Sequence, residues 1–459
     1  MTKATEAPNV YRLIGPSADN GDGDLLSDQS AKDSRLRLQA LIAEWLRMEN
    51  LVVLAGAGTS VSSGGKNMNG LEEEVLATVK ALKEIPAEVG KILDGRLAEL
   101  SSPSGTSSIG FEEWLSFLAN AHHIGLSIGS PFSDVIWKTG TPEKKHVSWL
   151  VENIGKSIFA ECALTLPEAG GSAAGIAPHF AFLSKLVARD SNLGRAHLFT
   201  LNYDTLFEQA LELLGIQYFD GFTGRADARF DPSVYGLDIY YPGEIAEGRV
   251  RRFDKFLHLY KLHGSIHWEV HGAELRARHP DLRDFSDYRN LSPSDKAGKF
   301  EPLMKALRPA GILPTANKFT QTLSMPFAHL FRSFQIRLGA PQTYLLVLGY
   351  GFGDEHVNHI IETALMNPSL VMLVVEPNPK APTIERIRSY KDLGKRAFVL
   401  TQTEDSFDAT GYKLAGFDDF SRSIMPDVQW LEDFLRLRRF EKQIAAGQKQ
   451  DDLAGDAGL

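Results

Sequence analysis

The stretch Leu-Val-Val-Leu-Ala-Gly-Ala-Gly-Thr-Ser spans residues 51–60 and predicts the first strand of the fold and the turn after it. Four apolar residues before Ala55 indicate a short strand buried on both faces, as in a parallel sheet. The chain then turns at Gly56 and Gly58, and glycine lets backbone N–H groups approach a ligand closely. Val61 stands where a dinucleotide-binding fingerprint carries Gly or Ala. The turn is therefore either a phosphate-binding loop or a plain strand-to-loop connection.

Three later stretches also place glycine or polar residues after an apolar run. They are Leu-Asn-Tyr-Asp at 201–204, Leu-His-Gly-Ser at 262–265 and Leu-Gly-Tyr-Gly-Phe-Gly-Asp at 348–354. The ends of successive strands line one crevice in an open parallel sheet. The sequence thus predicts an α/β fold, a Rossmann-like and mostly parallel sheet flanked by helices, with one site at the strand ends.

Composition is typical of a soluble globular protein. The chain has 459 residues, 43% of them hydrophobic and 23% charged, and a net charge of 49 − 58 = −9. This charge argues against a dominant nucleic-acid surface. The single cysteine, Cys162, excludes an intrachain disulfide and a cysteine-based zinc site. With no apolar signal core at the N-terminus and no apolar run long enough to span a membrane, we expect a cytoplasmic protein.

The pattern along the chain predicts three parts. Residues 1–32 indicate a flexible N-terminal arm, 33–425 a catalytic domain, and 426–459 a C-terminal helix followed by a disordered tail. Residues 66–175 show helical periodicity without a strong strand, so we expect an inserted helical subdomain that either covers the crevice or extends the core.

Further strands and helices are expected around the strand-end motifs. Polar residues 271–300 indicate an exposed excursion. The expected strands are 197–201, 256–262, 344–348, 370–375 and 396–401, with a possible hairpin around 237–242. The expected helices are 34–48, 178–189, 205–214, 326–339, 356–366 and 428–446.

In these motifs the chain resembles the SIR2-like, sirtuin-related family, and among its members the bacterial antiphage-defence type. The resemblance rests on five short motifs that occur in the same order as in the family. They are Gly-Ala-Gly-Thr-Ser at 56–60, Thr-Leu-Asn-Tyr-Asp at 200–204, Lys-Leu-His-Gly-Ser at 261–265, Gly-Tyr-Gly-Phe at 349–352 and Glu-Pro-Asn-Pro at 376–379.

The resemblance implies roles for the matching residues. It implies NAD+ as substrate, with His263, Asn202 and Asp204 as the catalytic residues. The residues that it implies for binding NAD+ are Gly56, Ala57, Gly58, Thr59, Ser60, Tyr203, Gly264, Gly349, Tyr350, Phe352, Glu376 and Asn378. Glu376 could accept from a ribose 2′-hydroxyl, or it is simply a solvent-exposed strand end. Asn-Pro at 378–379 is also an ordinary turn.

Elementary chemistry is compatible with these roles. Cleavage of the bond between nicotinamide and ribose builds positive charge on the sugar, as in glycoside cleavage. His263 can act as a base, because an unperturbed histidine titrates near working pH. Asn202 can orient water or the ribose hydroxyls, and Asp204 can bind the nicotinamide amide or stabilise positive charge. Alternatively, Asp204 only caps the following helix. His356 and His359 have no third ligand nearby, so we expect no metal.

Two departures argue against protein deacylation. Sirtuin deacylases carry a four-cysteine zinc module after the catalytic histidine, and this chain has no cysteine there. They also carry a Gly-Ile-Pro-Asp-Phe-Arg-like segment after the glycine loop, where this chain reads Ser-Ser-Gly-Gly-Lys-Asn at 62–67. Both departures leave NAD+ binding intact.

Three functions remain open. The favoured one is an NAD+ hydrolase that depletes NAD+ in antiphage defence. The alternatives are an NAD-dependent deacylase or ADP-ribosyl transferase, and a non-catalytic sensor of NAD or ADP-ribose. The resemblance implies control by homo-oligomer assembly or by a partner such as a helicase-type ATPase, an Argonaute-like protein or a phage-derived activator. We expect no membrane partner, because no apolar run is long enough to span a membrane.

Overall fold

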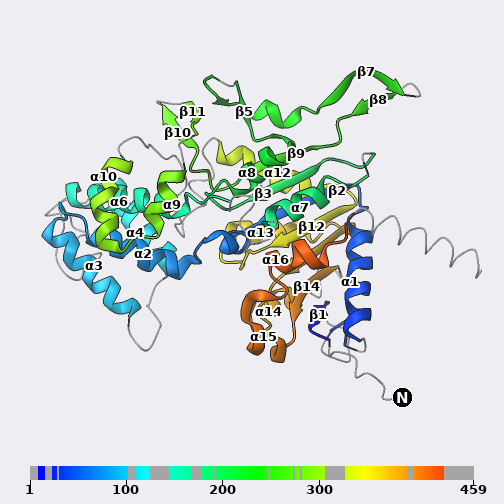
Figure 1. Ribbon diagram of the computed structural model, residues 1–459, viewed down its shortest axis with the longest axis horizontal. Coiled ribbons are helices and arrows are strands. Elements are labelled where there is room, and N and C mark those ends of the chain that lie inside the picture. Colours follow the sequence, from blue (N-terminus) through cyan, green and yellow to red (C-terminus); the bar gives the residue numbers. More distant parts are fainter. Residues whose placement is uncertain are drawn as a thin grey trace, which may run out of the picture.

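A sheet of mostly parallel strands forms the centre of the protein (Figure 1). The computed structural model describes residues 9–15, 23–27, 30–101, 110–124, 144–166, 177–190, 192–224, 226–246, 249–271, 274–279, 282–304, 326–390 and 396–427. The strands of the main sheet are β1 (Tyr11–Ile14), β2 (Asn50–Ala55), β3 (Ala196–Thr200), β4 (Gln217–Phe219), β9 (Phe256–Lys261), β12 (Thr343–Leu348), β13 (Leu370–Val375) and β14 (Ala397–Gln402). Their order is β1-β14-β13-β12-β2-β3-β9-β4, and among these strands only β1 is antiparallel to its neighbour.

Helices cover both faces of this sheet, which confirms the predicted α/β class (Figure 1). One face packs against α1 (Ala31–Trp45), α7 (Pro178–Leu186), α8 (Leu206–Leu213) and α16 (Phe417–Asp419), and the other against α12 (Phe327–Gly339), α13 (Glu355–Ala364) and α14 (Pro382–Ser389). Successive residues of a strand point to opposite faces. Val53 therefore joins the first core, and Val52 and Leu54 join the second. The apolar run of β2 is explained by burial on both sides.

The central strand β2 marks the point where the topology changes direction. It pairs with β3 on one side and with β12 on the other, both in parallel. Ligands of open α/β sheets bind outside the carboxyl ends of the strands at such a switch point. The turn that begins at Gly56 and the turn that begins at Gly349 both leave the sheet there.

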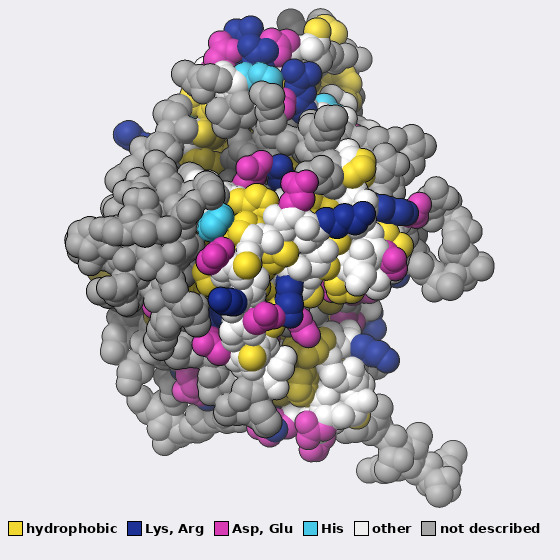
Figure 2. Space-filling model, turned by 90° about the vertical axis from the view of Figure 1, so that its left-hand side faces the viewer, with side chains coloured by type: hydrophobic (Ala, Val, Ile, Leu, Met, Phe, Trp, Pro, Cys, Tyr) yellow, Lys and Arg dark blue, Asp and Glu magenta, His cyan; other side chains and the backbone are white. Residues whose placement is uncertain are grey.

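A separate helical layer lies beside the carboxyl ends of the strands, at the left in Figure 1. It consists of α2 (Met68–Lys80), α3 (Ala87–Leu100), α4 (Phe111–Ile124), α6 (Lys144–Cys162), α9 (Arg283–Arg289) and α10 (Pro293–Met304). These helices share their own hydrophobic core. On the face shown in Figure 2, basic and acidic side chains are interspersed with hydrophobic ones. No helix in the described ranges is both long and apolar enough to cross a membrane.

Two predictions about exposed segments are wrong in part. The stretch 271–300 is not a plain exposed excursion, because Phe285, Tyr288 and Phe300 are buried in the core of the helical layer and Lys296 is fully buried. Within the supposed flexible arm, residues of β1 pair with β14 and Leu13 is fully buried. The expected helix at 428–446 lies outside the described residues.

Smaller elements complete the described chain. The hairpin lies slightly later than expected and consists of β7 (Tyr240–Ala246) and β8 (Arg249–Arg252). A second sheet has the order β10-β11-β6-β5 and is built from β10 (Trp268–His271), β11 (Glu274–Ala277), β6 (Arg229–Phe230) and β5 (Phe222–Thr223). The helix α15 (Glu404–Thr410) follows β14.

Candidate active site

A cavity of about 680 Å³ lies at the carboxyl ends of the central strands. Its walls come from the turns after β2, β3, β9 and β12 and, on the opposite side, from the helical layer. Most of the predicted site residues line it, namely Gly56, Ala57, Gly58, Ser60, Asn202, Tyr203, Asp204, His263, Gly349 and Tyr350. Four motifs far apart in the sequence therefore meet at one site.

The glycines of the first and last motifs let two turns pack backbone against backbone. A Cβ atom on Gly58 would lie 2.6 Å from the Cα atom of Gly349, and one on Gly56 would lie 2.6 Å from the Gly349 carbonyl oxygen. Gly349 itself has a positive φ of 61°. Real Cβ atoms do not approach so closely, so these glycines are required by the contact between the two turns, whether or not a ligand is bound.

The turn after β2 forms two short 3₁₀ helices that use many of its donors internally. The N–H groups of Gly58, Thr59 and Ser60 donate to backbone carbonyl oxygens of the two turns, and the N–H of Gly56 donates to the carbonyl at the end of β12. The Thr59 hydroxyl donates to the carbonyl of Gly56 at 2.8 Å. The expected cradle of backbone N–H groups is therefore largely occupied by its own hydrogen bonds.

Asn202 and Asp204 hold this turn from the neighbouring strand. The Nδ2 group of Asn202 donates to the Gly56 carbonyl, to Thr59 Oγ1 and to Ser60 Oγ at 3.1, 3.1 and 2.9 Å. Ser60 Oγ donates in turn to Asp204 Oδ2 at 2.6 Å. The other oxygen of Asp204 accepts from the N–H of residue 206, so the carboxylate also supports the start of α8. The capping role and the cavity position thus coexist.

A buried lysine on β9 fixes the turn that carries these two residues. Lys261 Nζ donates to the Asp204 carbonyl and pairs with Glu208 at 3.0 Å. Burial raises the pKa of Glu208, while the nearby Lys261 acts in the opposite direction. The N–H of Ile266 also donates to the Tyr203 carbonyl at 3.0 Å. The second and third motifs are therefore locked together.

His263 lies directly beside a carboxylate that was not among the predicted site residues. The distance from His263 Nε2 to Asp354 Oδ2 is 3.1 Å, and the two side chains are only 7% and 6% exposed. Asp354 Oδ1 caps α13 by accepting from the N–H groups of residues 356 and 357. A signal for Asp354 was present in the sequence, since an aspartate directly before a helical pattern commonly caps it.

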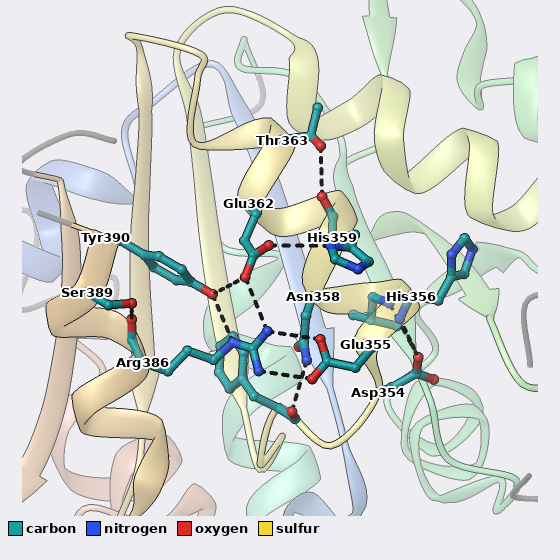
Figure 3. A network of polar contacts seen from close by, with 12 residues as sticks. Asp354, Glu355, His356, Asn358, His359, Glu362, Thr363, Arg386, Ser389 and Tyr390 are labelled. Carbon is teal, nitrogen blue, oxygen red and sulfur yellow. Dashed lines mark hydrogen bonds and ion pairs between the residues drawn. The ribbon is translucent and has the colours of Figure 1, made fainter. Parts of the chain in front are cut away.

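A polar network behind Asp354 fixes the start of α13 (Figure 3). The Tyr350 hydroxyl donates to Asn358 Oδ1 at 2.8 Å, and Asn358 Nδ2 donates to the Phe352 carbonyl at 2.9 Å. On the far side, Arg386 binds both oxygens of Glu355 at 3.2 Å each. Phe352 adopts a positive φ of 56°, which is unusual for a bulky residue, and these bonds hold the turn in that shape.

The opposite wall contributes a charged pair and the lone cysteine. Lys66 and Glu161 both line the cavity, and their closest atoms are 3.1 Å apart. Cys162 is next to them. Burial, with added effects of Asp204 and Glu161, raises the pKa of the Cys162 thiol to about 12. Neither Lys66 nor Glu161 was predicted as a site residue, although Lys66 directly follows a glycine pair in the sequence.

Five of the predicted residues do not line the cavity: Thr59, Gly264, Phe352, Glu376 and Asn378. Thr59 is buried beneath the first turn. Gly264 turns the chain after His263 with a φ of 87°. Glu376 Oε1 accepts from the Asn378 N–H, and Asn378 Oδ1 accepts from the N–H of residue 380, so both side chains serve the turn after β13. The structure therefore places Asn378 in an ordinary turn.

The acidic, histidine and cysteine side chains do not assemble into a metal centre within the part of the chain that the structure describes. No group of three or more His, Cys, Asp or Glu side chains among those residues is placed to hold a metal ion. His267 and His279 lie close, with their Nδ1 atoms 3.2 Å apart, but they form a pair only.

This architecture defines a class of protein. It is an α/β protein with a mostly parallel sheet and a cavity at the switch point of that sheet. Residues 196–394 match the family model described as SIR2-like domain. No curated protein matches the chain. One similar solved structure is described as a complex of ADP ribose with a point mutant of a Sir2 homologue. It is 12% identical with a TM-score of 0.28, covering 77% of this chain and 95% of that chain.

Proposed function

We propose that this protein is an NAD+ hydrolase that cleaves the bond between nicotinamide and ribose. The observation that carries the proposal is the meeting of His263, Asn202 and Asp204 at one cavity, with Asp354 beside the histidine. These groups lie at the switch point of a sheet that belongs in large part to a SIR2-like domain. The resemblance of the motifs to that family supplies the substrate class.

The carboxylate of Asp204 suits a reaction that develops positive charge on the sugar. It lines the cavity and accepts a hydrogen bond from Ser60 Oγ at 2.6 Å. A fixed negative group of this kind stabilises an oxocarbenium-like transition state. The nicotinamide leaves as a neutral molecule with the electron pair of the broken C–N bond.

In this proposal Asn202 orients the attacking water and His263 removes its proton. Because three oxygens occupy the Nδ2 group of Asn202, its Oδ1 is the amide atom left to accept from water or a ribose hydroxyl. His263 takes the proton from the attacking water, and the carboxylate of Asp354 stabilises the resulting imidazolium. The water oxygen then bonds to the anomeric carbon and gives ADP-ribose.

The test is a product balance. The full chain is incubated with NAD+, with and without an acetyl-lysine peptide, and all products are quantified by chromatography. The proposal predicts nicotinamide and free ADP-ribose in equal amounts, independent of the peptide. Peptide-dependent nicotinamide release would indicate a deacylase, and ADP-ribose attached to protein would indicate a transferase.

We further propose that the activity serves antiphage defence by depleting cellular NAD+. The support is the resemblance to the defence members of the family. An unregulated enzyme of this kind would kill its host, so we expect control by assembly, by the helical layer or by a partner. In cells expressing the chain, NAD+ should fall on phage infection, and should not fall with His263→Ala. An NAD+ level that is unaffected by infection would contradict this role.

A further inference from the structure

Few donors of the glycine turn are left for the phosphates of the substrate. The N–H groups of Gly56, Gly58, Thr59 and Ser60 donate to backbone carbonyl oxygens, and the hydroxyls of Thr59 and Ser60 donate to protein oxygens. A pyrophosphate carries about two negative charges. Such a ligand normally gains its binding energy from charge-assisted hydrogen bonds.

The charges of the cavity wall are unfavourable for an anion with one exception. Among the described residues that line the cavity, the acidic ones are Glu113, Glu161, Asp204 and Asp354, and Lys66 is the single lysine or arginine. The side chain of Lys66 is 33% exposed, so it can move without opening the core.

Lys66 is held in a four-membered ion network that would remain paired without it. Its Nζ lies 3.1 Å from Glu161 Oε2 and 3.1 Å from Glu74 Oε2. The other oxygen of each carboxylate is bound by Lys296, at 2.7 Å for Glu161 and 2.5 Å for Glu74. Lys296 is fully buried and reaches the network from α10. When Lys66 leaves, both carboxylates keep a cationic partner.

The two lysines of the network differ in their burial: Lys296 is fully buried, whereas Lys66 is partly exposed and can move. A buried carboxylate that loses its sole partner is strongly destabilised. Because Lys296 stays with Glu161 and Glu74, Lys66 can turn into the cavity without leaving either of them unpaired. The network thus keeps the Lys66 ammonium group at the cavity wall, from where it can move to an anionic ligand.

We propose that Lys66 binds the pyrophosphate of the dinucleotide substrate by exchanging its contacts with Glu74 and Glu161 for phosphate oxygens. This inference rests on the proposed function, since it takes a dinucleotide as the ligand. It adds a binding residue that the family motifs did not indicate. It also gives the helical layer a direct part in substrate binding, through Lys66 and the residues that hold it.

The experiment measures ligand binding rather than turnover. Isothermal titration calorimetry on the full chain compares ADP-ribose, which contains the pyrophosphate, with nicotinamide, which does not. A charged hydrogen bond accounts for about a 10- to 100-fold change in affinity. Lys66→Gln should therefore weaken ADP-ribose binding by about that factor and leave nicotinamide binding unchanged. Lys66→Arg, which keeps the charge, should retain most of the affinity.

Two further variants separate binding from a structural role. Lys80→Gln removes a lysine at the far end of α2, where it pairs with Asp94 outside the cavity lining, and should bind as the parent does. Glu74→Gln removes a competitor for Lys66, so ADP-ribose should bind more tightly. A lysine that only held the layer in place would give weaker binding in Glu74→Gln as well.

The outcomes distinguish this inference from the function on which it rests. Equal ADP-ribose affinity of the parent and Lys66→Gln would overturn the role of Lys66 and leave the hydrolase proposal standing. Weaker binding in Glu74→Gln would also overturn it, in favour of a structural network. A parent chain that binds neither ADP-ribose nor nicotinamide would overturn both proposals.

Discussion

Substitution of Gly349 by alanine tests whether the two glycine turns must touch. An added Cβ atom would lie 2.5 Å from the Thr59 nitrogen and 2.7 Å from both the Cα and the carbonyl carbon of Gly58. All three are backbone atoms, which cannot rotate away. Overpacking of this kind costs about 1–3 kcal/mol. The left-handed backbone at Gly349, with a φ of 61°, adds roughly 1–2 kcal/mol for alanine.

The expected loss for Gly349→Ala is therefore about 2–5 kcal/mol in the free energy of unfolding, a large part of a typical domain's stability. Gly353→Ala is the matched control in the same turn, because an added Cβ there meets no atom within 4 Å. Its stability should stay within about 1 kcal/mol of the parent.

Urea unfolding followed by tryptophan fluorescence and circular dichroism measures the difference, and ADP-ribose titration reports the site. Gly349→Ala should unfold at lower urea and bind ADP-ribose weakly. Gly58→Ala should do the same, because its Cβ would collide with Gly349 without any positive φ. If Gly349→Ala were as stable as Gly353→Ala, the inferred contact between the turns would be refuted.

Three further predictions concern ionisable groups. Asp354→Asn keeps a good cap for α13 but removes the carboxylate beside His263, so turnover should fall about 10- to 100-fold; an unchanged turnover would contradict the pairing. Because burial raises the pKa of Cys162 to about 12, iodoacetamide should alkylate it far more slowly at pH 8 than in the urea-unfolded chain, and equal rates would argue against that burial. Burial lowers the pKa of His179 to about 4, so the unfolded chain binds the extra proton first and stability should fall by roughly 3 kcal/mol from pH 6.5 to 4. His179→Phe should flatten that part of the stability curve, which pH-dependent unfolding would show.

The central strands could be predicted from the sequence because their apolar runs are unambiguous. Strands at 50–55, 343–348 and 370–375 are buried on both faces along most of their length. Their runs of Val, Leu and Met are also too short for a buried helix. The short edge strand at 11–14 was missed, since its partner β14 is almost four hundred residues away in the sequence. Pairing over such a distance leaves no local signal.

The error at 271–300 has a similar cause. This polar stretch contains a few separate aromatic residues, Phe285, Tyr288 and Phe300. They are buried because α2 and α6, from another part of the chain, pack against them. Lys296 was counted as a polar surface residue, yet it is buried because Glu74 and Glu161 neutralise it. Charged residues enter a core only where such partners exist, and those partners come from elsewhere in the chain.

Much of the candidate site could be found from strand-end motifs, because parallel strands bring their carboxyl ends to one edge. Asp354 ends one of these motifs, but neither it nor Lys66 was assigned to the site from the sequence. Their relevance comes from a 3.1 Å approach to His263 and from a place on the cavity wall. Which donors of the glycine turn are already used was likewise a property of the folded backbone, not of the motif.

The most direct test of the central claim is nicotinamide release from NAD+ by the parent chain beside His263→Ala and Asn202→Ala. The account predicts release by the parent and its loss in both variants, with circular dichroism showing that the variants remain folded. Asn202→Ala should also lower stability, because three oxygens of the glycine turn lose their donor. Undiminished release by a folded His263→Ala variant would contradict the account.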